Sequence, residues 1–256
     1  MSSTIPITLF FADFARGEGD RIAALFAGPV AIDSPLSGAI DGHDALEASL
    51  EQEGYWWQQH VREIQTVATL QNHRYDIVEL LVELHHQGKT FDLPVAIFGQ
   101  RSATGLGQIR IYHSTWPLNG HHTYRAPIVW PELTEEEEPE VVQAYFAALG
   151  RADLTLVLSL FAPDAYVREP SGAAYRHEGT EGLKRFYEKA LQSGGIGLTH
   201  ATTNFDGELF AVEYLCDSWG QTTFDPMAGC AFYELSDDRQ HIQAVRIYDD
   251  VTPPSA

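Results

Sequence analysis

The stretch that decides the fold is LSLFAPDAYVREPSG, residues 158–172, because the chain carries a second version of it. That version is AALFAGPVAIDSPLSG, residues 23–38. Both contain Leu-Phe-Ala, then a strand-like run, then a proline and a Ser-Gly pair. A spacing of about 135 residues is far longer than the 20 to 50 residues of a solenoid repeat, so it indicates a duplicated domain.

Two shorter matches follow in the same order and at nearly the same spacing. TFD at residues 90–92 returns at 223–225, and QIRIY at 108–112 returns, with one inserted residue, as QAVRIY at 243–248. A chain of 256 residues is long enough for two domains that each bury a core. We predict a first domain at residues 1–126, a linker at 127–139 and a second domain at 140–256.

The composition narrows the range of partners. The formal net charge is -20, which argues against nucleic acids and anionic membrane surfaces, since both require clustered Lys and Arg. Cys216 and Cys230, the two cysteines, provide neither a disulfide framework nor a zinc-binding pair. No basic region precedes the short apolar run at residues 5–14, and no segment reaches the ~18 apolar residues of a membrane span. We expect a cytoplasmic protein that binds a small hydrophobic molecule and needs no metal or other cofactor.

Periodicity predicts the same element order in both halves. Helical spacing is found at residues 10–26 and 141–161, a strand and hairpin follow at 30–40 and 165–177, and a third helix is expected at 45–52 and 181–192. Long alternating strands fill the rest of each half. Helices followed by an antiparallel meander indicate an α+β fold, with the helices packed on one face of a curved, mainly antiparallel sheet.

This order resembles the NTF2-like superfamily, in particular its ketosteroid isomerase and SnoaL-like polyketide cyclase branches. Two motifs of the second half carry the resemblance, FAPDAYVREP at residues 161–170 and GLKRFY at 182–187. The resemblance implies two tandem NTF2-like domains, each with three helices on a curved sheet. It also implies that domains pair sheet to sheet, here as an intramolecular pseudo-dimer or between two chains.

Glu169 is the first candidate catalytic residue. Strand alternation puts it on the face of Ala165 and Val167, where partial desolvation would raise the pKa of the carboxyl and make it a better base near neutral pH. By the resemblance, this position before a proline holds the base that moves a proton on a carbon next to a carbonyl. The alternative is a strand-end carboxylate in water, or one paired with Arg168 or Arg185.

Tyr145 is the second candidate. Its spacing to Glu169 resembles the tyrosine-to-base spacing of ketosteroid isomerases, which implies that its phenol donates a hydrogen bond to a substrate oxygen as that oxygen gains charge. The alternative is a core tyrosine, because Tyr145, Phe146 and Leu149 also fit one helix stripe.

Asp249 is the third candidate. The protonated aspartate implied by the ketosteroid isomerase resemblance should fall in residues 228–232, which read AGCAF. Asp249 instead ends the stripe of Val245 and Ile247, and SnoaL-like cyclases resemble this arrangement, with a catalytic aspartate on a late strand. It would act with Glu169 as a second acid or base. The alternative is a strand-end carboxylate in solvent.

The first half lacks this set: at the positions of Tyr145, Glu169 and Asp249 it has Phe10, Ser34 and His113. His113 with Asp33 forms a second candidate site, against the alternative of a histidine satisfied within the core. We expect the active site in the second domain and a structural role for the first.

Aromatic side chains and one cysteine of the second half are candidates for the wall of a cavity that holds a flat apolar ligand, against the alternative that they are ordinary core residues. They are Phe186, Tyr187, Tyr214, Trp219, Cys230 and Phe232.

Three functions remain open at this point. The first is a cofactor-independent isomerase or cyclase that moves protons on a polyketide- or terpenoid-like carbonyl compound. The second is an epoxide-opening cyclase or hydrolase of a biosynthetic pathway, because tandem proteins of polyether pathways resemble this duplicated layout. The third is a binding or accessory module without catalysis.

Overall fold

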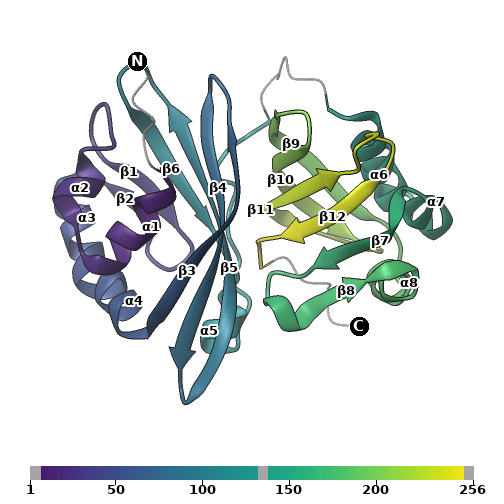
Figure 1. Ribbon diagram of the computed structural model, residues 1–256, viewed down its shortest axis with the longest axis horizontal. Helices are drawn as coiled ribbons and strands as arrows, with labels where there is room; N and C mark the ends of the chain where they lie inside the picture. The colour runs from purple at the N-terminus through teal and green to yellow at the C-terminus, as the bar shows by residue number, and fades with distance from the viewer. Residues whose placement is uncertain (1–6, 132–137, 251–256) are drawn as a thin grey trace. The chain divides into compact units, whose positions relative to one another are not determined.

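The computed structural model of the chain describes residues 7–131 and 138–250. It contains two compact units, the first ending at His121 and the second beginning at His122 (Figure 1). The predicted first domain extended to residue 126. The boundary lies earlier because residues after His121 bond within the second unit, where the Ala228 N–H donates to the Arg125 carbonyl at 2.8 Å. Of the predicted linker, residues 132–137 lie outside the described part of the chain.

The first unit begins with helices and continues with a short hairpin, further helices and a four-stranded meander, after which comes one short helix. Its elements are α1 (Ile7–Arg16), α2 (Gly19–Ala23), β1 (Ala31–Ser34), β2 (Gly38–Asp41), α3 (His43–Ser49), the π-helical turn η1 (Leu50–Gly54), α4 (Tyr55–His60), β3 (Val61–Gln71), β4 (Tyr75–His86), β5 (Lys89–Arg101), β6 (Leu106–Tyr112) and α5 (Trp116–Asn119).

The second unit repeats this order. Its elements are α6 (Glu140–Gly150), α7 (Leu154–Ser159), β7 (Phe161–Arg168), the 3-10 turn η2 (Ala173–Tyr175), β8 (Arg176–Glu178), α8 (Gly179–Ala190), β9 (Ile196–Phe205), β10 (Leu209–Trp219), β11 (Thr222–Leu235) and β12 (Ile242–Ile247).

The two sheets have the same topology. The strand orders are β2-β1-β6-β5-β4-β3 and β8-β7-β12-β11-β10-β9. In each sheet one neighbouring pair is parallel, β1 with β6 and β7 with β12, and the other pairs are antiparallel. The predicted fold class is confirmed: two tandem α+β domains, each with helices on one face of a mainly antiparallel sheet (Figure 1).

Each unit has its own core between helices and sheet. In α1, Phe10 and Phe14 share a face and are buried with Val78 and Leu80, alternate residues of β4. The second core is built in the same way from α6 and the interior face of β10 and β11. Burial of one large apolar side chain contributes about 1.5–3 kcal/mol, so these faces hold each helix on its sheet.

The third helical segment of the first unit is longer than predicted. It runs through α3, η1 and α4 to His60, past the expected end at residue 52. Gly54 permits this, because a Cβ there would lie 2.9 Å from the Phe14 carbonyl oxygen of α1. The five-residue π turn shifts the helical phase and turns Glu53 toward the interior, where the residue is 7% exposed.

The parallel strand pairs bring the candidate positions to one end of the strands in each sheet. Val167 is paired with Val245, and Arg168 with Arg246. Glu169 and Asp249 follow the carboxyl ends of β7 and β12, so both lie at the same end of the strands in the second sheet. The first unit places Ser34, the last residue of β1, and His113, which follows β6, at the corresponding end of its sheet.

Candidate active site

Glu169 lies at hydrogen-bond distance from a histidine. Its Oε1 lies 2.6 Å from Nε2 of His177 on β8, and the His177 ring packs on Phe186 with centroids 4.8 Å apart. The partner is thus neither Arg168, which lies over the Tyr248 ring, nor Arg185. The Glu169 side chain is 36% exposed, more than its apolar strand face suggested. The reason is that the chain turns after β7, where the Glu169 N–H donates to the Tyr175 carbonyl.

Tyr145 meets a second tyrosine inside the second unit. Its hydroxyl lies 2.8 Å from that of Tyr187 on α8, and both residues are buried. Desolvation raises the pKa of both phenols well above the usual value, so each keeps its proton at neutral pH. In such a pair one hydroxyl donates to the other, which leaves the second proton available for another acceptor.

Asp249 is buried and bound by a third tyrosine. It is 4% exposed, and the Tyr214 hydroxyl donates to its Oδ2. Burial, followed by the Asp249 charge, raises the pKa of Tyr214. Gly229 provides the space, because a Cβ there would lie 2.4 Å from Tyr214 Cε2 and 2.6 Å from Asp249 Oδ2. A glycine on β11 therefore permits this carboxylate–phenol pair.

Tyr233 connects these two pairs. Its ring centroid is 5.5 Å from that of Tyr145, and burial, then the charges of Tyr145 and Asp249, raise the pKa of its phenol. We call these five residues the tyrosine–aspartate cluster; they are Tyr145, Tyr187, Tyr214, Tyr233 and Asp249. The cluster places proton donors and one carboxylate inside the second unit. The Glu169–His177 pair lies at the same end of the sheet's strands as Asp249.

Of the other residues predicted to line the cavity, two lie near the tyrosines or α8 and two face away from the interior. Phe186 packs edge-on against Tyr187, with centroids 4.9 Å apart. Trp219 has a structural contact, because its Nε1–H donates to the Ala190 carbonyl at 2.7 Å. Cys230 and Phe232 do not line the interior: Gly229 is the residue paired with Tyr214, so strand alternation turns 230 and 232 to the opposite face.

The first unit does not form the predicted Asp33–His113 pair. Ile32 and Ser34 of β1 face the core, so Asp33 points to the other face of the sheet. His113 follows Ile109 and Ile111 on the interior face, where its ring meets Trp57 edge-on at 5.7 Å.

Glu53 takes the place of a strand-end carboxylate in the first unit. Its two oxygens accept hydrogen bonds from Ser34 Oγ at 3.1 and 3.0 Å, from Ser37 Oγ at 2.5 Å and from Trp57 Nε1 at 3.1 Å. Ser34 occupies the repeat position of Glu169, so both units hold a carboxylate near this strand end. Sequence reasoning missed Glu53, because a π turn shifts helical phase without leaving a pattern in the sequence.

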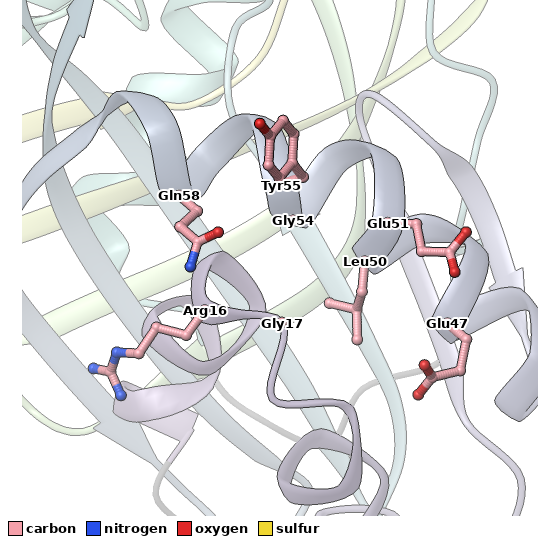
Figure 2. Close-up of a pocket in the computed structure, with 8 residues that line it drawn as sticks. All are labelled: Arg16, Gly17, Glu47, Leu50, Glu51, Gly54, Tyr55 and Gln58. Atoms are coloured by element: carbon pink, nitrogen blue, oxygen red, sulfur yellow. The ribbon is translucent and has the colours of Figure 1, made fainter.

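A surface groove of about 350 Å³ lies on the first unit, between the end of α1 and the segment from α3 to α4. Figure 2 shows Arg16 and Gln58 toward one end, Glu47 and Glu51 toward the other, and Leu50 between them. None of the predicted site residues lines this groove. The buried polar groups described above, and not this groove, carry the candidate chemistry.

The repeated strand order and the helices on each sheet define the class: two tandem α+β domains of one topology, as the NTF2-like resemblance implies. Within that class, residues 142–240 match the family model described as the SnoaL-like domain. The match lies within the second unit, which is therefore similar to the SnoaL-like domain over these residues, and the first unit repeats its strand order. Among the described residues, no helix has the length and apolarity to cross a membrane.

Solved structures similar to this chain include three bacterial proteins. One is assigned as a polyketide cyclase from Sinorhizobium meliloti, with 23% identity, 43% of this chain and 94% of that chain covered, and a TM-score of 0.35. Another is an LEH-like epoxide hydrolase of M. tuberculosis, with 18% identity, 43% and 80% coverage, and a TM-score of 0.37. The third is assigned as a ketosteroid isomerase from Kribbella flavida, with 21% identity, 46% and 82% coverage, and a TM-score of 0.35.

Proposed function

We propose that the second unit is a cofactor-independent isomerase or cyclase that transfers protons on a small hydrophobic carbonyl compound. The observation that carries the proposal is the hydrogen-bonded Tyr145–Tyr187 pair, which is buried and holds its protons at neutral pH. Donors that are fixed before the reaction stabilise an oxygen that gains negative charge, and they do so best away from water. The side chains packed around the pair are mostly apolar, which favours a hydrophobic substrate in this proposal.

Glu169 is the general base in this proposal. Its carboxylate takes a proton from the carbon next to the carbonyl, and the electron pair of the broken C–H bond moves to the carbonyl oxygen, giving an enolate. A phenol of the Tyr145–Tyr187 pair donates a hydrogen bond to that oxygen. In a conjugated substrate Glu169 then returns the proton to another carbon of the dienolate, which completes an isomerisation. In the other case the enolate carbon attacks a second carbonyl and closes a ring, and the new alkoxide takes the proton back from Glu169. His177 orients the base through its 2.6 Å contact.

Asp249 is the second acid or base. It is buried and bound to Tyr214, so its environment differs from that of Glu169, which is one-third exposed. Two carboxyl groups in different environments can serve as acid and base in one site. The same arrangement suits epoxide opening, in which one carboxyl protonates the ring oxygen while the other activates water, and this is the alternative function.

Binding of substituted phenols tests the proposal. Phenolates mimic the enolate, so calorimetry across a series of phenols of decreasing pKa should show rising affinity. The measurements are best made in the Glu169→Gln variant as the background for further substitutions, since it lacks the negative charge of the proposed base. Tyr145→Phe in that background should weaken phenolate binding by about 10- to 100-fold, the loss of one hydrogen bond to a charged group.

Tyr175→Phe is the matched control, because this tyrosine is 38% exposed and outside the cluster. Affinity that does not change with phenol pKa, or that falls equally in Tyr175→Phe, would contradict the oxyanion role. Turnover of an epoxide by the unsubstituted chain, without exchange of carbonyl α-protons, would favour the alternative.

A further inference from the structure

Three aromatic side chains from two elements meet in the first unit, apart from the hydrogen bonds of Glu53. Trp56 and His60 lie on α4, and His86 is the last residue of β4. The His60 ring stacks on Trp56 at 4.2 Å, with an angle of 16° between the planes. The His86 ring meets both edge-on, 4.8 Å from His60 and 5.4 Å from Trp56. Two imidazoles that are distant in sequence are thus neighbours in space.

The hydrogen bond of His60 fixes which of its nitrogens can bind a ligand. Nδ1 lies 2.7 Å from the Trp56 carbonyl oxygen. A carbonyl oxygen only accepts, so Nδ1 carries a proton, and in the neutral ring Nε2 is the nitrogen with the lone pair. Histidines that bind metals are usually held in this way, with the other ring nitrogen donating to a carbonyl or carboxylate.

His86 has a ring nitrogen that lacks a partner. It ends the interior-facing row of Val82 and Leu84, and among the described residues its buried Nδ1 finds no hydrogen-bond partner. A buried polar atom left unsatisfied is costly, which points to a group that would normally sit beside it. Its neighbour His85 is exposed and contacts Thr90 Oγ1 at 3.1 Å.

We propose that His60 and His86 together bind one divalent transition-metal ion in the first unit. Imidazole nitrogens favour Zn²⁺, Ni²⁺ and Cu²⁺ over Ca²⁺ and Mg²⁺, whose ligands are oxygens. The described residues hold no cluster of three or more His, Cys, Asp or Glu side chains suited to a metal, so water fills the other positions. The net charge of -20 raises the local concentration of cations. The site is independent of the function proposed for the second unit.

Titration of the full chain with Ni²⁺, measured by calorimetry without an affinity tag of histidines, tests the site. We expect one ion per chain. His60→Gln and His86→Gln should each weaken binding by at least about tenfold, because each removes a ligand and second-shell changes alone cost 10–100-fold. His85→Gln is the matched control and should bind as the unsubstituted chain does. Thermal unfolding without metal establishes that all three variants fold.

Quenching of tryptophan fluorescence by Cu²⁺ locates the ion. Trp56 touches both histidines, so its emission should fall on binding. Trp56→Phe should lower that quenching, with the neighbouring Trp57 left to report the ion, and should still bind it, because the His60 hydrogen bond goes to the backbone carbonyl at this position. Absence of stoichiometric binding would overturn the proposal, and so would equal losses in the His85→Gln and His86→Gln variants.

Discussion

The hydroxyl groups of Tyr145 and Tyr187 lie 2.8 Å apart inside the second unit, where each phenol is the other's hydrogen-bond partner. Tyr145 comes from the first helix of that unit and Tyr187 from the last. The contact therefore ties two helices together while it holds a proton donor inside an apolar core. Stability and proposed chemistry depend on the same pair, and both can be measured.

Removing one of the two hydroxyls should lower the free energy of unfolding by more than half of what removing both does. Tyr145→Phe or Tyr187→Phe leaves the other buried hydroxyl unsatisfied, which should lower the free energy of unfolding by about 1–3 kcal/mol. The double variant leaves no unpaired hydroxyl. In a double-mutant cycle we therefore expect a coupling energy of about 1 kcal/mol between the two substitutions. Urea unfolding of the four proteins measures this. Strict additivity would mean that the two hydroxyls do not bond.

Stability should fall above pH 10. Burial raises the pKa of Tyr145, Tyr187, Tyr214 and Tyr233 in the folded chain. The unfolded chain loses these protons near pH 10 and the folded chain does not, so this contribution is complete below pH 10 and is lost as pH rises beyond it. The loss should approach about 1.4 kcal/mol per pH unit for each tyrosine.

Urea unfolding between pH 8 and pH 12, with tyrosinate absorbance recorded in parallel, tests this pH dependence. The absorbance of the four buried phenols should appear together with unfolding. The Tyr145→Phe/Tyr187→Phe variant should show a shallower decline, and an equal slope would contradict the assignment to these two residues.

Gly229 should not tolerate a side chain. Alanine there would meet Tyr214 and Asp249 at less than 3 Å, and overpacking of this kind costs about 1–3 kcal/mol. Gly107→Ala on β6 is the matched control, because its nearest neighbours are 3.9 Å away. Thermal unfolding of the two variants compares them. Similar stability of both would show that Tyr214 and Asp249 move apart freely.

The Glu169–His177 pair should govern turnover once a substrate is found. Glu169→Gln removes the base, and we expect a loss of about 10²- to 10⁴-fold in kcat. His177→Gln should also lower kcat, with a changed pH profile, since it alters the partner of the base. Arg176→Gln is the control, because the exposed Arg176 pairs instead with Glu178. Unchanged kinetics in Glu169→Gln would remove this residue from the mechanism.

Glu53 should stabilise the first unit without serving the second. Glu53→Gln replaces one of two acceptor oxygens by a donor in a site built from serine and indole donors, so the free energy of unfolding should fall by about 1.5–3 kcal/mol. Glu51→Gln, an exposed position on the same turn, should be neutral. Phenolate binding by the second unit should be the same in both variants, and a loss in Glu53→Gln would link the two units functionally.

The sequence by itself determined the duplication, the α+β class and the order of the elements. Repeats and periodicity are properties of the linear sequence, so they can be recognised without knowledge of contacts between elements. Alternation also grouped Asp249 with Val245 and Ile247, because residues two apart on a strand share a face whatever the rest of the fold does.

Only the tertiary structure decided what each polar group meets. Alternation does not say which face of a strand is the core, so Cys230 and Phe232 could be placed only through the register between β10 and β11. The Tyr145–Tyr187 contact joins residues on separate helices, and Glu53 reaches Ser34 through a π turn that no sequence pattern announces. Hydrogen bonds depend on tenths of an ångström between elements, and that precision arises only when the helices pack on the sheet.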